Sequence, residues 1–235
     1  MCPPARLVRP AHVRVVESFE DLLAAEFAGD CNAICWERDL AGDFDEVVRR
    51  LDVAEGVTTV DEAELEAMPA SAAGALAVST LLADLRALRE AGHAPELNCV
   101  EQYARDQDEV LPTDVCSFHV DSATLPTDTF LCCYTGAASE GLPNAEAERC
   151  VDIPHLRAAL LARHGGDDDE GFASFLHEHH FDLHYSPLAH ARPFSMGIGH
   201  LWRVAVQFPG SPVPGCIHRA PTTLRGDALR LLLIS

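Results

Sequence analysis

A histidine and an aspartate two residues apart, His119 and Asp121, constrain this chain more than any other feature of its sequence. Side chains at positions i and i+2 of a β-strand point to the same side of a sheet, so His119 and Asp121 can face one ion. A later histidine, His218, can complete the set from a neighbouring strand. Because the chain contains 12 histidines, an isolated His-x-Asp pair is weak evidence for a metal site, and its surroundings decide the interpretation. The three residues are the candidate metal ligands if they lie in β-strands.

Short β-forming segments surround the candidate ligands. They are rich in β-branched and aromatic residues and are separated by proline and glycine. These segments cover residues 98–104, 129–135, 201–208, 215–218 and 229–234. Short strands with tight turns around a ligand are typical of a small β-barrel or jelly roll. The predicted fold is therefore α+β, with a double-stranded β-helix (a cupin-like jelly roll) as its core and helices packed outside.

Helical patterns dominate the first 95 residues. Ser18 precedes a turn rich in acids, and residues 43–51 have acids first and arginines last, as the helix dipole favours. Residues 71–91 carry a stripe of leucines. We expect residues 1–95 to form a mainly helical elaboration packed on the barrel. Residues 96–235 would form the metal-binding core of one integrated domain.

Two imidazoles and one carboxylate on one face, with other positions open, form the facial triad of non-haem Fe(II) oxygenases. Arg230 follows in an apolar strand, where a guanidinium is costly unless it meets an anion. Its position resembles that of the basic residue that binds the distal carboxylate of the cosubstrate in the Fe(II)/2-oxoglutarate-dependent oxygenase (cupin-like) superfamily. This resemblance implies Fe(II) at the triad and 2-oxoglutarate on Arg230. The alternative for Arg230 is an edge-strand arginine whose head group reaches water.

Three further residues are candidates for the same site. Tyr134 and Thr129 lie on the strand that follows Asp121, and we expect them to help bind the cosubstrate by hydrogen bonds. Arg219 is next to His218 and is a candidate catalytic residue, because it could orient that ligand or bind substrate. The predicted activity is a hydroxylase-type oxidation of a small molecule or a peptide.

The order of the motifs also resembles a bacterial domain-of-unknown-function family, number 1826. The matching motifs are Trp36-Glu37-Arg38, Cys116-Ser117-Phe118-His119-Val120-Asp121, Tyr134-Thr135-Gly136, His218-Arg219-Ala220-Pro221 and Arg230-Leu231-Leu232-Leu233. They extend from about residue 31 to the C-terminus. Ala220 stands where the family pattern has serine, and the acidic, histidine-rich stretch near residues 165–190 resembles an insertion. The family implies no function.

Composition excludes several classes of partner. The net charge is −20, and the chain contains 17 arginines and no lysine, which argues against nucleic acids and anionic membrane surfaces. No segment reaches the roughly 18 to 20 apolar residues that a membrane span needs. Nine cysteines form no recognisable disulfide framework, and no signal peptide is apparent, so we expect a cytoplasmic protein.

Two alternatives to the oxygenase remain open. The same triad could hold Zn²⁺, Mn²⁺ or Ni²⁺ in a cupin-like isomerase or hydrolase that uses no 2-oxoglutarate. The protein could instead be a non-enzymatic metal binder that uses the triad and the histidines between His177 and His190. Those histidines do not match the H-E-x-x-H pattern of zinc proteases.

Overall fold

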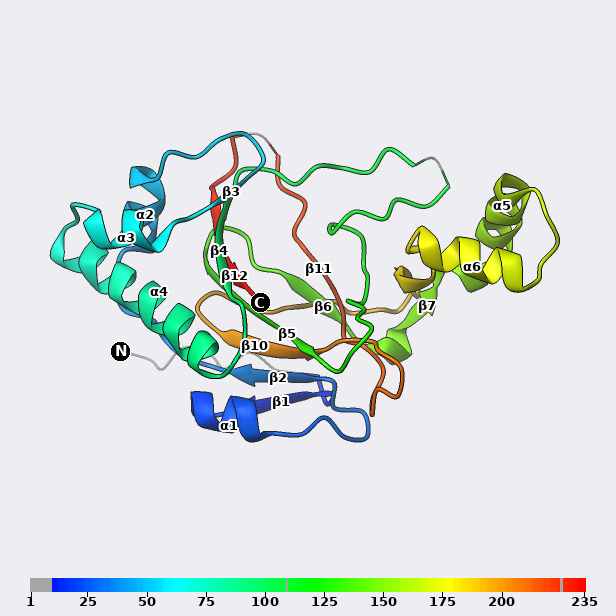
Figure 1. Ribbon diagram of the computed structural model, residues 1–235, viewed down its shortest axis with the longest axis horizontal. Helices are drawn as coiled ribbons and strands as arrows, with labels where there is room; N and C mark the ends of the chain where they lie inside the picture. Colours follow the sequence, from blue (N-terminus) through cyan, green and yellow to red (C-terminus); the bar gives the residue numbers. More distant parts are fainter. Residues whose placement is uncertain (1–9, 109, 225) are drawn as a thin grey trace.

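A seven-stranded sheet forms the centre of the computed structural model, which describes residues 10–108, 110–224 and 226–235 (Figure 1). Its strand order is β1-β2-β10-β5-β12-β4-β3. The β1–β2 pair is parallel, and all other pairs in this sheet are antiparallel. The seven strands are β1 (Val13–Val16), β2 (Ala33–Trp36), β3 (Val57–Thr59), β4 (Glu96–Val100), β5 (Asp128–Thr135), β10 (Leu201–Ala205) and β12 (Arg230–Ile234).

A smaller sheet, of order β11-β6-β9, carries one of the candidate ligands. The segment around His119 joins this sheet, because His119 forms a β-bridge with His218 of β11. A separate hairpin pairs β7 with β8. The bounds of these strands are β6 (Glu140–Leu142), β7 (Ala147–Arg149), β8 (Tyr185–Pro187), β9 (Phe194–Ser195) and β11 (Ile217–Arg219).

In the described part of the chain six α-helices lie outside the sheets, with α2–α4 at one end of the long axis of Figure 1 and α5 and α6 at the other. Their bounds are α1 (Phe19–Ala24), α2 (Phe44–Arg50), α3 (Glu62–Ala67), α4 (Ala72–Glu90), α5 (Pro154–His164) and α6 (Glu170–Glu178). Three short 3₁₀ helices cover Asn144–Glu146, Cys150–Asp152 and Phe181–Leu183. No helix in the described ranges combines the length and apolar character needed to cross a membrane.

The predicted helix starts are confirmed by their capping hydrogen bonds. The side chains of Ser18, Asp43 and Ser71 accept hydrogen bonds from backbone N–H groups in the first turns of α1, α2 and α4. The mixed α+β class is confirmed as well. In the part of the chain that the structure describes, the strands form separate sheets and no closed barrel, so the jelly roll stays a prediction. The predicted N-terminal elaboration also supplies β1, β2 and β3 to the large sheet.

The two faces of the large sheet belong to different cores. The outer face packs against α2 and α4 through a cluster that includes Leu85, Phe130 and Leu231. The inner face forms a second cluster that includes Leu131 and Leu232 and extends to Cys216 beside β11. Because side chains alternate along a strand, Arg230 lies on the same face as Leu232, the inner face.

The outer face also holds a buried polar network, and this network corrects one prediction. Tyr134 donates a hydrogen bond to Asp84 of α4 at 2.6 Å, and Arg38 binds the same carboxylate through two hydrogen bonds. The Tyr134 ring stacks on Phe44 of α2. Tyr134 therefore connects the sheet to its helices and lies on the face opposite to the candidate ligands.

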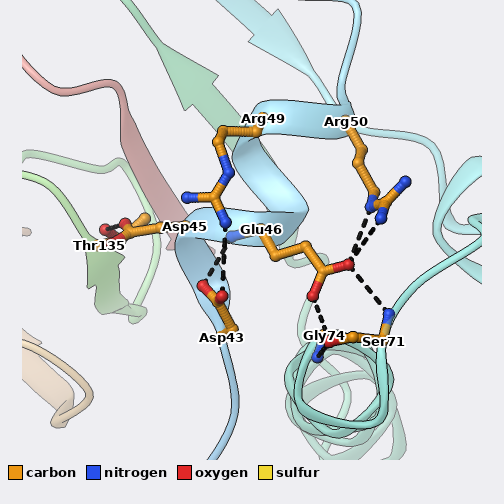
Figure 2. A network of polar contacts seen from close by, with 8 residues as sticks. All are labelled: Asp43, Asp45, Glu46, Arg49, Arg50, Ser71, Gly74 and Thr135. Atoms are coloured by element: carbon orange, nitrogen blue, oxygen red, sulfur yellow. Dashed lines mark hydrogen bonds and ion pairs between the residues drawn. The ribbon is translucent and has the colours of Figure 1, made fainter.

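A second network clamps α2 to the first turn of α4 (Figure 2). The carboxylate of Glu46 accepts hydrogen bonds from the backbone N–H and the hydroxyl of Ser71 and from the guanidinium of Arg50. A Cβ atom at Gly74 would lie 2.6 Å from Glu46 Oε2, so a larger residue there would displace this carboxylate. The hydrogen bonds from Ser71 and then from Arg50 lower the pKa of Glu46 to about 2.

We expect the substitution Glu46→Gln to destabilise the fold near neutral pH and to matter less in acid. The lowered pKa means that the carboxylate stabilises the folded state above its ordinary pKa of 4.5 and loses this contribution as the pH falls towards about 2. Urea unfolding measures the free energy of unfolding at about pH 7 and about pH 3. The difference in this free energy between the variant and wild type should be smaller at about pH 3. Glu64→Gln, at an exposed position of α3, is the control and should leave the free energy of unfolding unchanged at both pH values. An equal loss at both pH values would contradict this role of Glu46.

Candidate metal centre

His119, Asp121 and His218 meet in the structure as the sequence predicted. His119 Nε2 lies 3.7 Å from Asp121 Oδ1, and His218 Nε2 lies 3.8 Å from Asp121 Oδ2. One ligand atom from each of the three residues lies within 4.8 Å of the others. Within the described ranges this is the only group of three or more histidine, cysteine or acidic side chains that meets this condition. The space between the three ligand atoms is suited to one divalent ion.

Backbone pairing fixes the relative position of the two histidines. His119 and His218 exchange two backbone hydrogen bonds, of 3.0 and 2.9 Å, so they are directly opposite each other on neighbouring strands. Directly paired residues place their side chains on the same face of a sheet. Asp121 lies two residues after His119 in the same extended segment. Its backbone carbonyl accepts a hydrogen bond of 2.8 Å from the N–H of Gln207. The local β structure therefore aims all three side chains at one point.

Both imidazoles are held in the tautomer that a metal needs. The Nδ1 atom of His119 lies 2.8 Å from the Ser117 carbonyl oxygen, and the Nδ1 atom of His218 lies 3.1 Å from the Cys216 carbonyl oxygen. A carbonyl oxygen can only accept, so each Nδ1 carries the proton and each Nε2 keeps its lone pair. Such partners orient the ring and increase its basicity towards a metal.

The charges at the site also suit a cation. Burial, with His218 nearby, lowers the pKa of His119 to about 4, so this ring is neutral at neutral pH, as a metal ligand must be. Burial opposes ionisation of Asp121, but His218 and the Thr129 hydroxyl outweigh it and lower the pKa of this carboxyl group. Thr129 donates its hydrogen bond to Asp121 Oδ2 at 2.6 Å. Thr129 therefore orients a ligand, a role different from the cosubstrate binding predicted for it.

A cavity of about 180 Å³ opens beside the three ligands and contains Arg230. Arg230 is 1% exposed, and its guanidinium donates to the hydroxyls of Tyr103 at 2.7 Å and Ser139 at 2.5 Å. Its Nε atom is buried and has no hydrogen-bond partner within residues 10–108, 110–224 and 226–235. Among the residues that the structure describes, the hydrogen-bond partners of this guanidinium are neutral. A buried guanidinium in this state favours an anion in the cavity.

Arg219 is not part of the cavity. Its guanidinium makes two hydrogen bonds to Glu140 Oε2, of 2.8 and 2.6 Å, and lies over the Phe118 ring. Since Arg219 directly follows His218 on β11, its side chain points to the opposite face of the small sheet. The predicted catalytic role is therefore not supported by its position.

Sequence reasoning missed three polar residues of the cavity, Asn98, Tyr103 and Ser139. Asn98 is on β4, and Tyr103 and Ser139 lie in loops. The sequence around these residues does not indicate a binding site, because long-range strand pairing brings them to the cavity. Asn98 is the exception, since the two-residue period of β4 places it on one face with Val100, which also lines the cavity.

The histidines between residues 177 and 190 divide into two groups. His177, His179, His180 and His190 are exposed, and none of them belongs to the group of three candidate ligands. His184 is 4% exposed, forms a β-bridge with His119, and has its ring centroid 5.7 Å from that of His119. Three histidines thus form a row across neighbouring segments, although His184 contributes no ligand atom to the three-residue group.

Comparisons with known proteins add no relative to this description. No family model, no curated protein and no solved structure matches the chain.

Proposed function

We propose that the protein is a non-haem Fe(II)- and 2-oxoglutarate-dependent oxygenase that oxidises a small molecule or a peptide. The observation that supports this function most directly is the presence of two features in one cavity. One is a set of two histidines and one carboxylate, and the other is the buried guanidinium of Arg230, whose hydrogen-bond partners among the described residues are neutral.

The three ligands fit ferrous iron. His119, Asp121 and His218 supply two imidazole nitrogens and a carboxylate on one side, which is the donor set of the facial triad. Iron bound there would supply the redox chemistry that couples decarboxylation of a 2-oxo acid to oxidation of a second molecule. The chain's own groups prepare the site: two backbone carbonyls fix the rings, and Thr129 fixes the carboxylate.

Arg230 fits the distal carboxylate of the cosubstrate. A guanidinium holds a carboxylate through parallel, charge-assisted hydrogen bonds, and burial strengthens them. Tyr103 and Ser139 hold the head group in place without neutralising it. Leu232 and Val100 surround it with apolar surface, which excludes water from this part of the cavity.

The order of the strands supports the jelly-roll part of the proposal. After β4 in the large sheet, the chain enters the small sheet at His119, returns with β5, and enters the small sheet again with β6 and β9. It then places β10, β11 and β12 in the large, small and large sheet in turn. Two facing sheets filled alternately by one chain are the arrangement of cupin-like jelly rolls. We propose the relation to the uncharacterised bacterial family, number 1826, on the motifs alone.

Turnover of the cosubstrate tests the function. Protein loaded with Fe(II) and supplied with ascorbate as the two-electron reductant should slowly convert 2-oxoglutarate and O₂ to succinate, CO₂ and water, even before a substrate is known. Succinate measured by chromatography should depend on both Fe(II) and O₂. Protein that holds Fe(II) but forms no succinate would contradict the oxygenase and favour a cupin-like enzyme or a metal binder that uses another divalent ion.

A further inference from the structure

We infer that the substrate group that enters the cavity is uncharged and mainly aliphatic, and that Val57, Val115 and Ile234 form the surface that selects it. This inference rests on the proposed function, because it assigns the cavity beside the metal ligands to cosubstrate and substrate together.

The charged groups of the cavity already have partners under the proposed function. Asp121 belongs to the metal, and Arg230, with its two hydroxyl partners, belongs to the cosubstrate. Half of the residues that line the cavity are apolar. A second ionised group brought into this space would be desolvated without a counter-charge, which is strongly unfavourable.

Asn98 is the remaining polar residue of the lining. Its Oδ1 atom accepts a hydrogen bond from the Thr59 hydroxyl. The amide NH₂ group is on the other side of the Asn98 side chain from this hydrogen bond. This NH₂ group can donate to one uncharged acceptor, such as a carbonyl oxygen. The cavity therefore offers one neutral hydrogen-bonding position within an apolar wall.

Three large apolar residues of the lining are exposed to solvent, and they form the apolar mouth of the cavity. Val57 is 50%, Val115 43% and Ile234 38% exposed, and all three line the cavity. They come from β3, from the loop before His119, and from the end of β12, so three distant parts of the chain contribute to the exposed part of the lining. Exposed apolar side chains that cluster around a hollow are typical of a binding site.

The register of the sheet places Val57 next to the proposed cosubstrate anchor, whereas Ile234 lies four residues further along β12. Val57 pairs with Val100 on β4, and Val100 pairs with Arg230 on β12. The three side chains form one row across the inner face, with Val57 at the solvent end. A group held by Val57 is therefore adjacent to a cosubstrate held by Arg230.

The size of the cavity limits how much of a substrate can enter. Its volume is about 180 Å³, which is the space of roughly six water molecules at about 30 Å³ each. A dicarboxylate of the size of 2-oxoglutarate fills most of this space. The substrate thus inserts one small aliphatic group past the apolar mouth, and the rest of it stays outside.

Methyl NMR with a neutral probe tests the inference. The chain has five isoleucines, so protein labelled at the isoleucine δ1 methyl groups gives a simple spectrum. Ile234 reports on the mouth, and Ile198, which is 43% exposed and does not line the cavity, is the internal control. The protein is loaded with Zn²⁺ as a diamagnetic stand-in for iron and with 2-oxoglutarate, and it is then titrated with hexanamide. We expect the Ile234 signal to shift and the Ile198 signal to stay.

Two matched changes make the test specific. The variant Val57→Asp should weaken hexanamide binding at least tenfold, whereas Val15→Asp should not, because Val15 is 47% exposed on β1, the opposite edge strand of the same sheet. In wild type, 6-aminohexanamide, which places an ammonium group at the aliphatic end, should bind at least tenfold more weakly than hexanamide.

The outcomes separate the inference from the proposed function. Equal binding of the two probes, or equal responses of Ile198 and Ile234, would overturn the inference while metal and 2-oxoglutarate still bind. Protein that binds neither the metal nor 2-oxoglutarate would overturn both.

Discussion

The variant Asp121→Ala should bind Fe(II) at least about 100-fold more weakly than wild type and should still fold. The carboxylate is the only anion among the three candidate ligands. Loss of a residue that only hydrogen-bonds to a metal ligand already costs about 10- to 100-fold in metal affinity. Its side chain is 30% exposed and packs in no hydrophobic cluster, so its removal leaves no large void. Metal content after dialysis, with circular dichroism as the check on folding, measures the effect.

Two further variants show whether the loss is specific. Asp167→Ala removes an exposed acid from the loop between α5 and α6 and should leave metal content unchanged. Thr129→Val keeps the size of the side chain and removes only the hydrogen bond to Asp121, so we expect a smaller loss, about 10-fold. Unchanged metal content in Asp121→Ala would rule out the triad as the metal centre.

The variant Arg230→Met should lose 2-oxoglutarate binding and keep Fe(II). Removing one partner of a buried, hydrogen-bonded charge pair costs about 2–5 kcal/mol, which corresponds to roughly 30-fold or more in affinity. The metal ligands are on other segments and keep their own hydrogen bonds, so Fe(II) affinity should change by no more than a few-fold. Calorimetric titrations of the metal and of the cosubstrate measure the two affinities separately.

Comparison with 2-oxobutanoate shows whether Arg230 reads the distal carboxylate. This acid keeps the 2-oxo acid end and lacks the second carboxylate, so wild type should prefer 2-oxoglutarate and Arg230→Met should not. Arg219→Met is the matched control, because this arginine is beside His218 but pairs with Glu140 outside the cavity. Equal losses of Fe(II) and 2-oxoglutarate in Arg230→Met would indicate that Arg230 has a structural role instead.

The sequence predicted the candidate ligands and Arg230 because the patterns that indicate them are local. His119 and Asp121 share a face through the two-residue period of extended backbone. An arginine in the apolar segment before Leu231 had to be paired or exposed, and the structure buries it beside the ligands. Helix starts at Ser18 and Ser71 were predictable since capping depends on neighbouring residues alone.

The two-residue period of a strand also argues against Tyr134 and Arg219 as residues of the site. Thr129 and Tyr134 are five residues apart, so a regular strand places them on opposite faces, and Thr129 is the one that reaches Asp121. Arg219 is next to a ligand in sequence and for that reason faces away from it.

The pairing of His184 with His119 and the contact of Ser139 with Arg230 could not be found from the sequence. His184 reaches His119 through a β-bridge between segments 65 residues apart, and Ser139 reaches Arg230 from a loop. Nothing near either residue in the sequence specifies these pairings. They follow from the tertiary arrangement of the sheets.

The most direct test of the proposed function is an anaerobic titration of the protein with Fe(II), with and without 2-oxoglutarate, followed by visible absorption. A 2-oxo acid that chelates ferrous iron through two oxygens gives a weak visible band, which requires the open positions of a facial triad. We predict a band that forms only when both components are present and that disappears in His218→Ala. Absence of the band from protein that holds both Fe(II) and 2-oxoglutarate would contradict the proposed oxygenase.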